Sequence, residues 1–311
     1  AVIISLSRSI LRALTTRSLP TSFCSPQFQR FSTKMAEKII DGNAIAASIR
    51  AGLKERISEM GRAPGLAVIL VGGRRDSATY VRMKKKACAE VGITSFGIDY
   101  STEVTEQEIL EKIDELNANP DVHGILVQLP LPPHINEQTV IERVVVNKDV
   151  DGLHPLNVAK LSSTNTHSAG GRTGLSFNDI DYHVACTPQG CIELLDSIGC
   201  TIESKRAVVL GRSNMVGIPV AMLLIQRNAT VTVVHSRTVD IPSVVREADI
   251  VVAAVGRAEL VKGDWLKPGA VVIDVGVNSV DDATVKKGYR LVGDCDFASC
   301  QDVASRITPV P

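Results

Sequence analysis

The stretch "AVVLGRSNMVGIPVA", residues 207–221, combines an apolar run, a glycine turn and the start of a second apolar segment. Gly211 ends the predicted strand, Gly217 lies in the predicted helix, and Ser213 stands between them. A glycine turn of this kind lets backbone N–H groups and a helix N-terminus approach a phosphate. The match to G-x-G-x-x-G is imperfect, because Ser213 occupies the second glycine position and the last glycine comes one residue late. The order strand, turn, helix predicts a dinucleotide-binding unit, with a purely structural glycine turn as the alternative.

The sequence around this stretch alternates between strand and helix patterns. Strands are predicted at 207–211, 230–235, 249–256 and 270–278, and helices at 187–200, 217–228 and 241–248. Strands that alternate with helices form parallel sheets covered on both faces. We therefore predict a doubly wound Rossmann domain over residues 186–311.

The second strand of this domain ends in "VVHSRT", residues 233–238. An Asp or Glu at this place usually binds the adenosine ribose of NAD. Here the hydroxyl of Ser236 and the guanidinium of Arg237 suit a 2'-phosphate, and Arg212 can add a second positive group. The sequence favours NADP over NAD.

The N-terminal half repeats the α/β alternation. Helices are predicted at 43–60, 76–87 and 105–120, and strands at 65–73, 95–100 and 123–133. The helix at 105–120 begins with a capping box, Thr105 to Glu108, and ends at Asn119-Pro120. We predict a first parallel α/β domain over residues 37–185. Within it, the Ser-, Thr- and Gly-rich segment 161–181 is expected to be a loop or linker.

Composition limits the classes of partner. The chain has 311 residues, which is enough for two domains, and 34 basic residues balance 34 acidic ones. Neither a nucleic acid nor a membrane is therefore expected as a partner, and a small molecule is more compatible with these numbers. The cysteines are odd in number, seven, and contain no C-x-x-C pair, so we expect reduced thiols and no metal site.

The first 36 residues have a composition of their own. They contain five basic residues, many Ser and Thr, and no acid. Such a segment is typical of an organellar transit peptide, which here predicts import into the mitochondrial matrix. The chloroplast stroma and a merely disordered tail are the alternatives.

The segment "DSATYVRMKKKA", residues 76–87, is the candidate catalytic helix of the first domain. Ser77, Tyr80 and Lys84 fall on one helical stripe, directly after a strand end where open α/β sheets bind ligands. An amine that is partly desolvated beside a phenol can relay protons near neutral pH. A solvated charged helix face is the alternative.

Two further segments place polar groups at strand ends of the same predicted sheet. Gln128 ends the strand "GILVQLPLP", and "NKDVDGLHPLN" at 147–157 brings Asp149, Asp151 and Gly152 into a turn. An amine, an amide and a carboxylate that come from separate loops can form one site.

Six stretches, taken in order, resemble the bifunctional methylenetetrahydrofolate dehydrogenase/cyclohydrolase family. They are "YVRMKKKACAEVGI", "GILVQLPLP", "KDVDGLHPLNV", "CTPQG", "GRSNMVGIPVA" and "ITPVP", and the resemblance covers residues 38–311. It implies two α/β domains that flank a cleft, the second of which binds NADP and forms a homodimer. It also implies NADP-dependent oxidation of 5,10-methylenetetrahydrofolate to the methenyl form, and hydrolysis of that product to 10-formyltetrahydrofolate.

The resemblance also implies roles for individual residues. Lys84 matches the proton-transfer amine, Tyr80 the aromatic against the folate, Gln128 the partner that holds Lys84, and Asp151 an acceptor for the pterin ring. The implied folate contacts are Tyr80, Val81, Arg82, Met83, Lys84, Val127, Gln128, Leu129, Asp151 and Pro311. The implied NADP contacts are Gly211, Arg212, Ser213, Ser236 and Val277, to which the 2'-phosphate argument adds Arg237.

The sequence departs from the family pattern in three places. The family continues beyond "TPVP", its 161–181 segment is shorter, and it usually has proline where this chain has Ala185. These departures keep open a second hypothesis, a folate- and NADP-binding protein with impaired or no catalysis. A short-chain dehydrogenase, which also carries Tyr-x-x-x-Lys, is disfavoured because its glycine loop precedes the Tyr, whereas here it follows.

Overall fold

The computed structural model describes residues 38–163, 182–285 and 288–310. These residues divide into two compact units. The first comprises 46–163 and 182–187, and the second comprises 38–45 and 188–310. Residues 38–45, which the sequence placed in the first domain, pack with the second unit, where Ile40 N donates to Ile307 O at 2.9 Å. The predicted transit peptide, most of the 161–181 segment and Pro311 lie outside the described residues.

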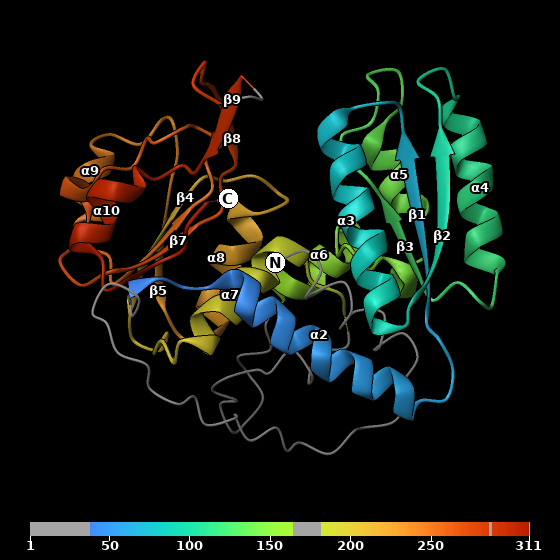
Figure 1. The fold of residues 1–311 in the computed structure, drawn as a ribbon, viewed down its shortest axis with the longest axis horizontal. Coiled ribbons are helices and arrows are strands. Elements are labelled where there is room, and N and C mark those ends of the chain that lie inside the picture. Colours follow the sequence, from blue (N-terminus) through green and yellow to red (C-terminus); the bar gives the residue numbers. More distant parts are fainter. Residues whose placement is uncertain (1–37, 164–181, 286–287, 311) are drawn as a thin grey trace. The chain divides into compact units, whose positions relative to one another are not determined.

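The first unit is built on a parallel sheet of three strands, in the order β2-β1-β3. The strands are β1 (Gly65–Val71), β2 (Thr94–Tyr100) and β3 (Gly124–Val127). Every residue of β1 is buried, as expected for a central strand covered on both faces. Figure 1 shows α3 (Arg75–Val91) and α4 (Glu106–Ala118) on opposite sides of these strands.

The side chains of β1 divide between two hydrophobic clusters. Leu66, Val68 and Leu70 pack with residues of α2 (Gly42–Glu59) and α3. Ala67, Ile69 and Val71 point to the other face, toward α4 and α5 (Glu137–Arg143). This alternation is the period of two that a strand requires.

The predicted capping box at the start of α4 is confirmed. Thr105 Oγ1 accepts from Glu108 N at 3.3 Å, and Glu108 Oε2 accepts from Thr105 N at 2.8 Å. The two side chains satisfy N–H groups that have no partner inside the helix, so the local sequence sets where α4 begins.

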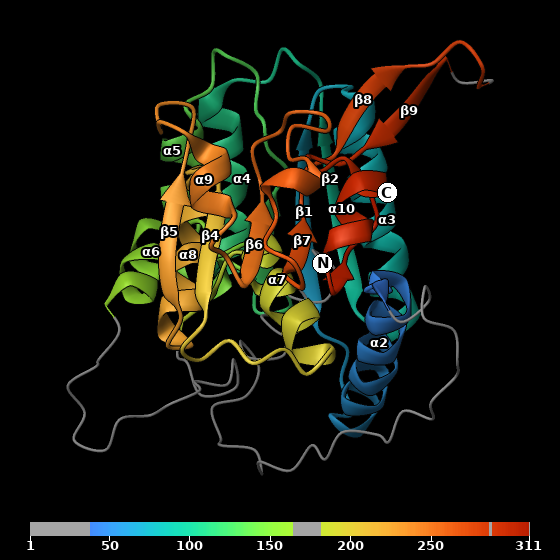
Figure 2. The same ribbon diagram turned by 90° about the vertical axis from the view of Figure 1, so that its left-hand side faces the viewer.

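The second unit contains a parallel sheet of five strands in the order β10-β7-β6-β4-β5. Figure 2 shows four of them, β7, β6, β4 and β5, side by side. The strands are β4 (Arg206–Leu210), β5 (Thr230–Val234), β6 (Ile250–Ala253), β7 (Val271–Asp274) and β10 (Arg306–Ile307). The helices are α7 (Cys186–Ser197), α8 (Gly217–Gln226), α9 (Ile241–Val245) and α10 (Phe297–Val303). Because β5 follows β4 on one side and β6 returns to the other, the strand order reverses at β4. The two-domain α/β prediction is confirmed.

Several elements do not appear among the sequence predictions. The predicted strand 270–278 is wrong beyond Asp274, because the chain leaves β7 there and enters an antiparallel hairpin. Gly276 marks the break, since a Cβ at this position would lie 2.0 Å from Asp294 Oδ1. The unpredicted elements are β8 (Asn278–Asp281), β9 (Tyr289–Val292), α5, α6 (Pro155–Ser162), α10, β10 and the 3-10 turns Val146–Lys148 and Gly263–Trp265.

The described residues contain neither a membrane-spanning helix nor a cluster of metal ligands. None of their helices combines the length and the hydropathy that a membrane crossing requires. Among the same residues, no group of three His, Cys, Asp or Glu side chains is placed to hold a metal ion. The six cysteines that fall within these ranges are all free thiols, and five of them are buried.

Candidate functional site

Helix α3 presents two kinds of surface along the predicted stripe. Ser77 and Lys84 are buried, with 4% and 7% of their surfaces exposed, whereas Tyr80 is 45% exposed. The predicted stripe therefore lies along the margin of the buried face, with Tyr80 on its open side. The solvated-face alternative does not hold for Lys84.

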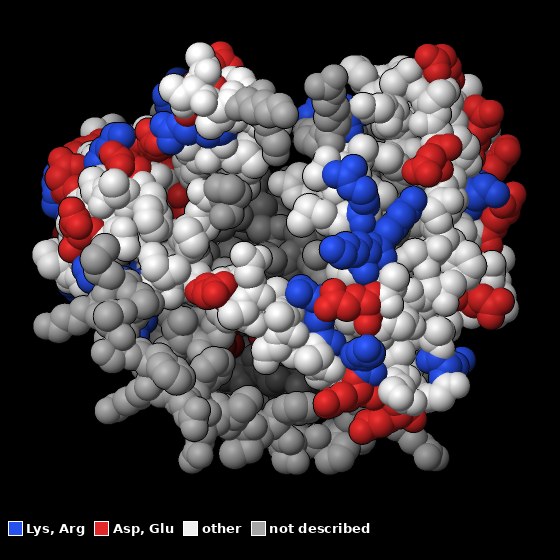
Figure 3. Space-filling view, viewed as in Figure 1, with Lys and Arg blue, Asp and Glu red and all other residues white. Residues whose placement is uncertain are grey.

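The three consecutive lysines of α3 have three different surroundings. Lys84 is buried, Lys85 pairs with Asp99 at 3.7 Å between Nζ and Oδ2, and Lys86 is exposed. Figure 3 shows basic side chains gathered over α3, where Arg82 and Lys86 are exposed. The run thus contains one buried amine and is not a uniform basic surface.

The ammonium of Lys84 is held by a group from another strand end. Its Nζ donates to Gln128 Oε1 at 3.1 Å, and Gln128 Nε2 in turn donates to Leu129 O at 2.9 Å. Gln128 directly follows β3, and α3 follows β1. Because these two strands are adjacent and parallel, Gln128 and Lys84 come together at the same edge of the sheet. A buried amine without such an acceptor would be costly.

The carboxyl group of Asp151 lies within electrostatic reach of this amine. Burial raises the pKa of Asp151, while the positive charge of Lys84 opposes this rise and the carboxylate of Asp149 adds to it. Cys186 Sγ also donates to Asp151 Oδ1 at 3.5 Å. An amine and a carboxyl group that lie within electrostatic range of one another can take part in proton transfer at one site.

The turn that carries Asp151 is fixed mainly by Asp149. The Asp149 carboxylate accepts from Leu153 N at 3.3 Å, from His154 N at 2.8 Å and from Asn157 Nδ2 at 2.8 Å. Gly152 has a φ of 66°, and a Cβ there would lie 2.4 Å from the Val184 carbonyl carbon, so the turn requires glycine.

Lys148 anchors the same turn to the end of α4. Its Nζ donates to three backbone carbonyls, at 3.0 Å to Leu116 O, 2.7 Å to Asn117 O and 2.9 Å to Asn119 O. A cation at the C-terminus of a helix satisfies carbonyls that have no partner within the helix.

Two members of this group are not among the site residues that the sequence predicts. Asp149 was recognised only as part of a turn, and Cys186 only as a buried thiol. The sequence holds a signal for Asp149, because it lies two residues from Asp151 in "KDVDG". Cys186 had none in the spacing alone, since 34 residues separate it from Asp151.

The remaining predicted folate contacts occupy different surroundings. Val81 and Val127 are buried in the two hydrophobic clusters, while Arg82 and Met83 are exposed on α3. Leu129 is half-buried next to Gln128.

The glycine turn of the second unit leaves no space for side chains. Gly211 has a φ of 112°, and a Cβ there would lie 2.2 Å from Ala254 O. A Cβ on Gly217 would lie 2.3 Å from Gly211 O. Ser213, in the second glycine position, uses its Oγ to accept from Val216 N at 3.2 Å and Gly217 N at 3.3 Å, which ties the turn to the start of α8. The close approach fits a phosphate-binding turn.

The other predicted NADP contacts lie at the carboxyl ends of strands in the same sheet. Ser236 and Arg237 follow β5, where Thr238 Oγ1 accepts from His235 N at 3.0 Å and closes the turn. Both side chains are exposed, as is Arg212 after β4. Val277, beyond β7, is 49% exposed. Ligands of open α/β sheets bind at this edge, beside the point where strand order reverses.

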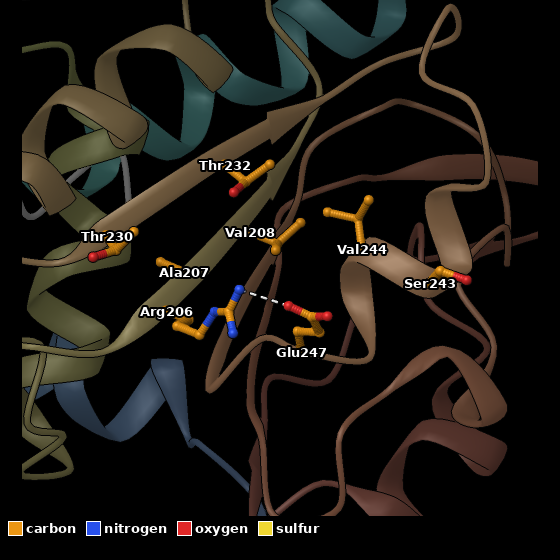
Figure 4. A pocket seen from close by; sticks show the side chains of 8 residues that line it. All are labelled: Arg206, Ala207, Val208, Thr230, Thr232, Ser243, Val244 and Glu247. Atoms are coloured by element: carbon orange, nitrogen blue, oxygen red, sulfur yellow. Dashed lines mark ion pairs between the residues drawn. The ribbon is translucent and has the colours of Figure 1, made fainter.

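A pocket on the same sheet lies elsewhere. It has a volume of 250 Å³ and is bordered by an ion pair between Arg206 Nη2 and Glu247 Oε2 at 2.6 Å (Figure 4). Arg206 and Thr230, the first residues of β4 and β5, line it. It is therefore at the amino ends of these strands, opposite the glycine turn.

Known proteins resemble this chain along most of its length. It is 54% identical to bifunctional protein FolD 2 of Arabidopsis thaliana, over 90% of this chain and 91% of that protein. Two further Arabidopsis relatives are FolD 4, chloroplastic, at 51% (88% and 73% covered), and FolD 1, mitochondrial, at 48% (90% and 77% covered). The methylenetetrahydrofolate dehydrogenase-cyclohydrolase of Trypanosoma brucei, solved with NADP and an inhibitor, is 42% identical with a TM-score of 0.79, over 88% and 90% of the two chains.

Two family models together match most of the described chain. Residues 40–151 match the catalytic domain of tetrahydrofolate dehydrogenase/cyclohydrolase, and residues 185–311 match its NAD(P)-binding domain. With the site geometry and the relatives above, these matches show that the chain belongs to the tetrahydrofolate dehydrogenase/cyclohydrolase family.

Proposed function

We propose that this chain oxidises 5,10-methylenetetrahydrofolate with NADP and hydrolyses the methenyl product to 10-formyltetrahydrofolate, with Lys84 as the group that moves protons. One observation carries the assignment. The Lys84 ammonium is buried, is hydrogen-bonded to Gln128 Oε1 at 3.1 Å and interacts with the Asp151 carboxyl group.

The oxidation needs a site that tolerates positive charge on the substrate. NADP, when bound, accepts the hydride that leaves the methylene carbon. The product is a cation whose charge is shared between N5 and N10 of the folate. A fixed ammonium would repel this cation, whereas an amine that shares its proton with a neighbouring acceptor does not. Gln128 orients the amine, and Asp151 offers an oxygen to the pterin ring.

The hydrolysis uses the same amine. With Lys84 in its neutral amine form, water attacks the methenyl carbon and loses a proton to the amine, which leaves a neutral hydroxyl adduct. Lys84 then returns a proton to N5 while the bond between this carbon and N5 breaks. The hydroxyl proton is released, so the formyl group forms on N10 with one net proton lost. General acid–base transfer of this kind contributes about 10²–10⁴ to a rate.

Binding of folate and NADP without catalysis is the second candidate. Reduction of NADP is followed at the nicotinamide absorbance band, and binding is followed by the ligand-induced rise in melting temperature. A rise in melting temperature without turnover would favour this candidate.

Lys84→Met is the first test of the assignment. The variant keeps a long side chain but cannot transfer a proton, so we expect hydrolysis of methenyltetrahydrofolate to fall by about 10² or more. Binding of NADP should stay within about twofold, because the glycine turn lies on another sheet. Lys86→Met, exposed on the same helix, is the control and should behave as wild type. Equal loss of hydrolysis and NADP binding would contradict the role.

Asp149→Asn tests the electrostatic setting of Asp151. The Asp149 charge raises the pKa of Asp151, so its removal should lower that pKa. Because the ionised form of Asp151 is the stronger acceptor for the pterin ring, the acid limb of the pH profile of kcat/KM should move to lower pH. Asp114→Asn, in an exposed pair with Arg143 on α4, is the control. An acid limb that stays in place or moves to higher pH would refute the prediction.

Arg237→Ala tests the choice of cofactor. If the guanidinium pairs with a 2'-phosphate, KM for NADP should rise by about tenfold, which corresponds to about 1.4 kcal/mol. KM for NAD should change little, because NAD has no 2'-phosphate. Arg246→Ala is the control, since its Nε donates to Asp264 O at 3.0 Å within the fold. A wild-type preference for NAD would overturn the NADP assignment.

We further propose that the second unit forms a homodimer. Within the described residues, β5 pairs only with β4, and its sequence "TVTVV" has no charge to protect the free edge. Light scattering during size exclusion should give twice the mass of one chain. Thr232→Lys, which places a charge on this exposed strand, should shift the mass toward one chain; a monomeric wild type would refute the proposal.

Import into the mitochondrial matrix is proposed for residues 1–36. The five cations without an acid support it, and a relative named as mitochondrial and another named as chloroplastic show that both destinations occur in the family. Residues 1–36 fused to a fluorescent protein should enter mitochondria. Import into chloroplasts would favour the alternative, and a cytosolic fusion would refute both.

A further inference from the structure

Two carboxylates of the second unit lie behind the carboxyl ends of its strands and take no part in the proposed chemistry. Asp274 is the last residue of β7, and Asp294 follows β9. Asp294 is completely buried, with 0% of its surface exposed. A buried carboxylate persists in a fold only where hydrogen-bond donors surround it.

Asp294 is surrounded by four donors. Its Oδ2 accepts from Val255 N at 2.6 Å and from Gly256 N at 3.0 Å. Its Oδ1 accepts from Arg257 N at 2.9 Å and from Asn278 Nδ2 at 2.9 Å. Three of these donors are successive backbone N–H groups of one loop, residues 255–257. The fourth comes from the first residue of β8.

The 255–257 loop occupies a particular place in the sheet. It follows β6, which pairs with β4, and it begins next to Ala254, whose carbonyl oxygen is the atom that Gly211 approaches. Asn278 is adjacent to Val277, one of the proposed NADP contacts. The carboxylate therefore links the loop after β6 to the segment after β7. Dinucleotide contacts are expected at the ends of both strands.

Asp274 holds Asp294 itself in place. Asp274 Oδ1 accepts from Asp294 N at 2.9 Å and from Gly276 N at 3.2 Å, and its Oδ2 accepts from Cys295 N at 2.8 Å. The space around both carboxylates is closed, since a Cβ on Gly293 would lie 1.9 Å from Asp274 Oδ2. Burial raises the pKa of Asp274 to about 6, against the N–H groups of Cys295 and Asp294, which lower it.

We propose that Asp294 is a positioning residue for the dehydrogenase step, because its carboxylate fixes the 255–257 loop and Asn278 in the shape that the bound dinucleotide requires. This inference rests on the proposed use of NADP at this edge of the sheet. Asp294 acts through the loop and does not itself contact the cofactor, since it is fully buried. Its loss should therefore affect oxidation and spare the hydrolysis, which uses no NADP.

Asp294→Asn in the full chain tests this separation. The amide has nearly the same size and shape as the carboxylate, but its NH₂ group cannot accept a hydrogen bond. The donors that face this NH₂ therefore lose their acceptor. We expect KM for NADP to rise by about tenfold or more. Hydrolysis of methenyltetrahydrofolate, measured without NADP, should stay within about twofold of wild type.

Asp249→Asn is the matched control. Asp249 precedes β6 at the opposite end of the same strand, where its Oδ2 accepts from Arg206 N at 3.0 Å and its Oδ1 accepts from Lys267 Nζ at 2.6 Å. This carboxylate is structural, so the variant should lower the melting temperature without changing KM for NADP. If Asp249→Asn raised KM for NADP as much as Asp294→Asn, a general structural role would replace the positioning role.

Two results for Asp294→Asn would contradict its role as a positioning residue. An unchanged KM for NADP in Asp294→Asn, or a parallel loss of oxidation and hydrolysis, would overturn the inference. If Asp294→Asn does not fold, Asn278→Ala removes one donor from Oδ1, and KM for NADP should rise by about threefold with hydrolysis retained; an unchanged KM would overturn the inference equally. A wild-type chain with no NADP-dependent oxidation would instead refute the proposed function.

Discussion

The arrangement of polar groups in the first unit depends on one constraint: the buried amine of Lys84 needs a hydrogen-bond acceptor inside the protein. Lys84 is drawn out of water by the same helix face that buries Val81 and Cys88, so its ammonium must find oxygen atoms inside the protein. Gln128 provides one, and the charge of Asp151 provides further stabilisation. Because β1 and β3 are adjacent and parallel, the helix after one strand and the amide after the other meet at the same edge.

In the second unit, backbone N–H groups and not a side-chain amine form the candidate binding turn. The turn between β4 and α8 can bring N–H groups close to a phosphate only because Gly211 and Gly217 have no Cβ. The Oγ of Ser213 then accepts from Val216 N and Gly217 N, which a glycine in its place could not do. A carboxylate, Asp294, orders the loop on the next strand with three successive N–H bonds. Each unit thus places its polar groups at the carboxyl ends of parallel strands.

The sequence predicted the parts that depend on local pattern. The apolar run of β1, the capping box of α4 and the glycine turn after β4 each lie within a few residues, and the structure confirms these elements. The shared edge of the parallel strands predicted that Lys84 and Gln128 converge on one site, whereas the pairing of the two side chains was implied by the family resemblance. The different exposures of Tyr80 and Lys84 were not predictable. The spacing shows which residues share a helix face, but how deeply each is buried depends on how the helix packs on the sheet. The hydrogen bonds from the 255–257 loop to Asp294 were not predicted. They join residues 37 to 39 positions apart, and the hairpin between them has no regular apolar pattern.

The ammonium of Lys148 has a mechanical consequence for the first unit. It holds three carbonyl oxygens near the end of α4, while its neighbour Asp149 orders the turn that contains Asp151. Fraying of the last helical turn would withdraw those oxygens and release the turn together with the helix. We therefore expect local opening at the end of α4 to loosen the turn that contains Asp151, and amide exchange at the end of α4 would report on this opening.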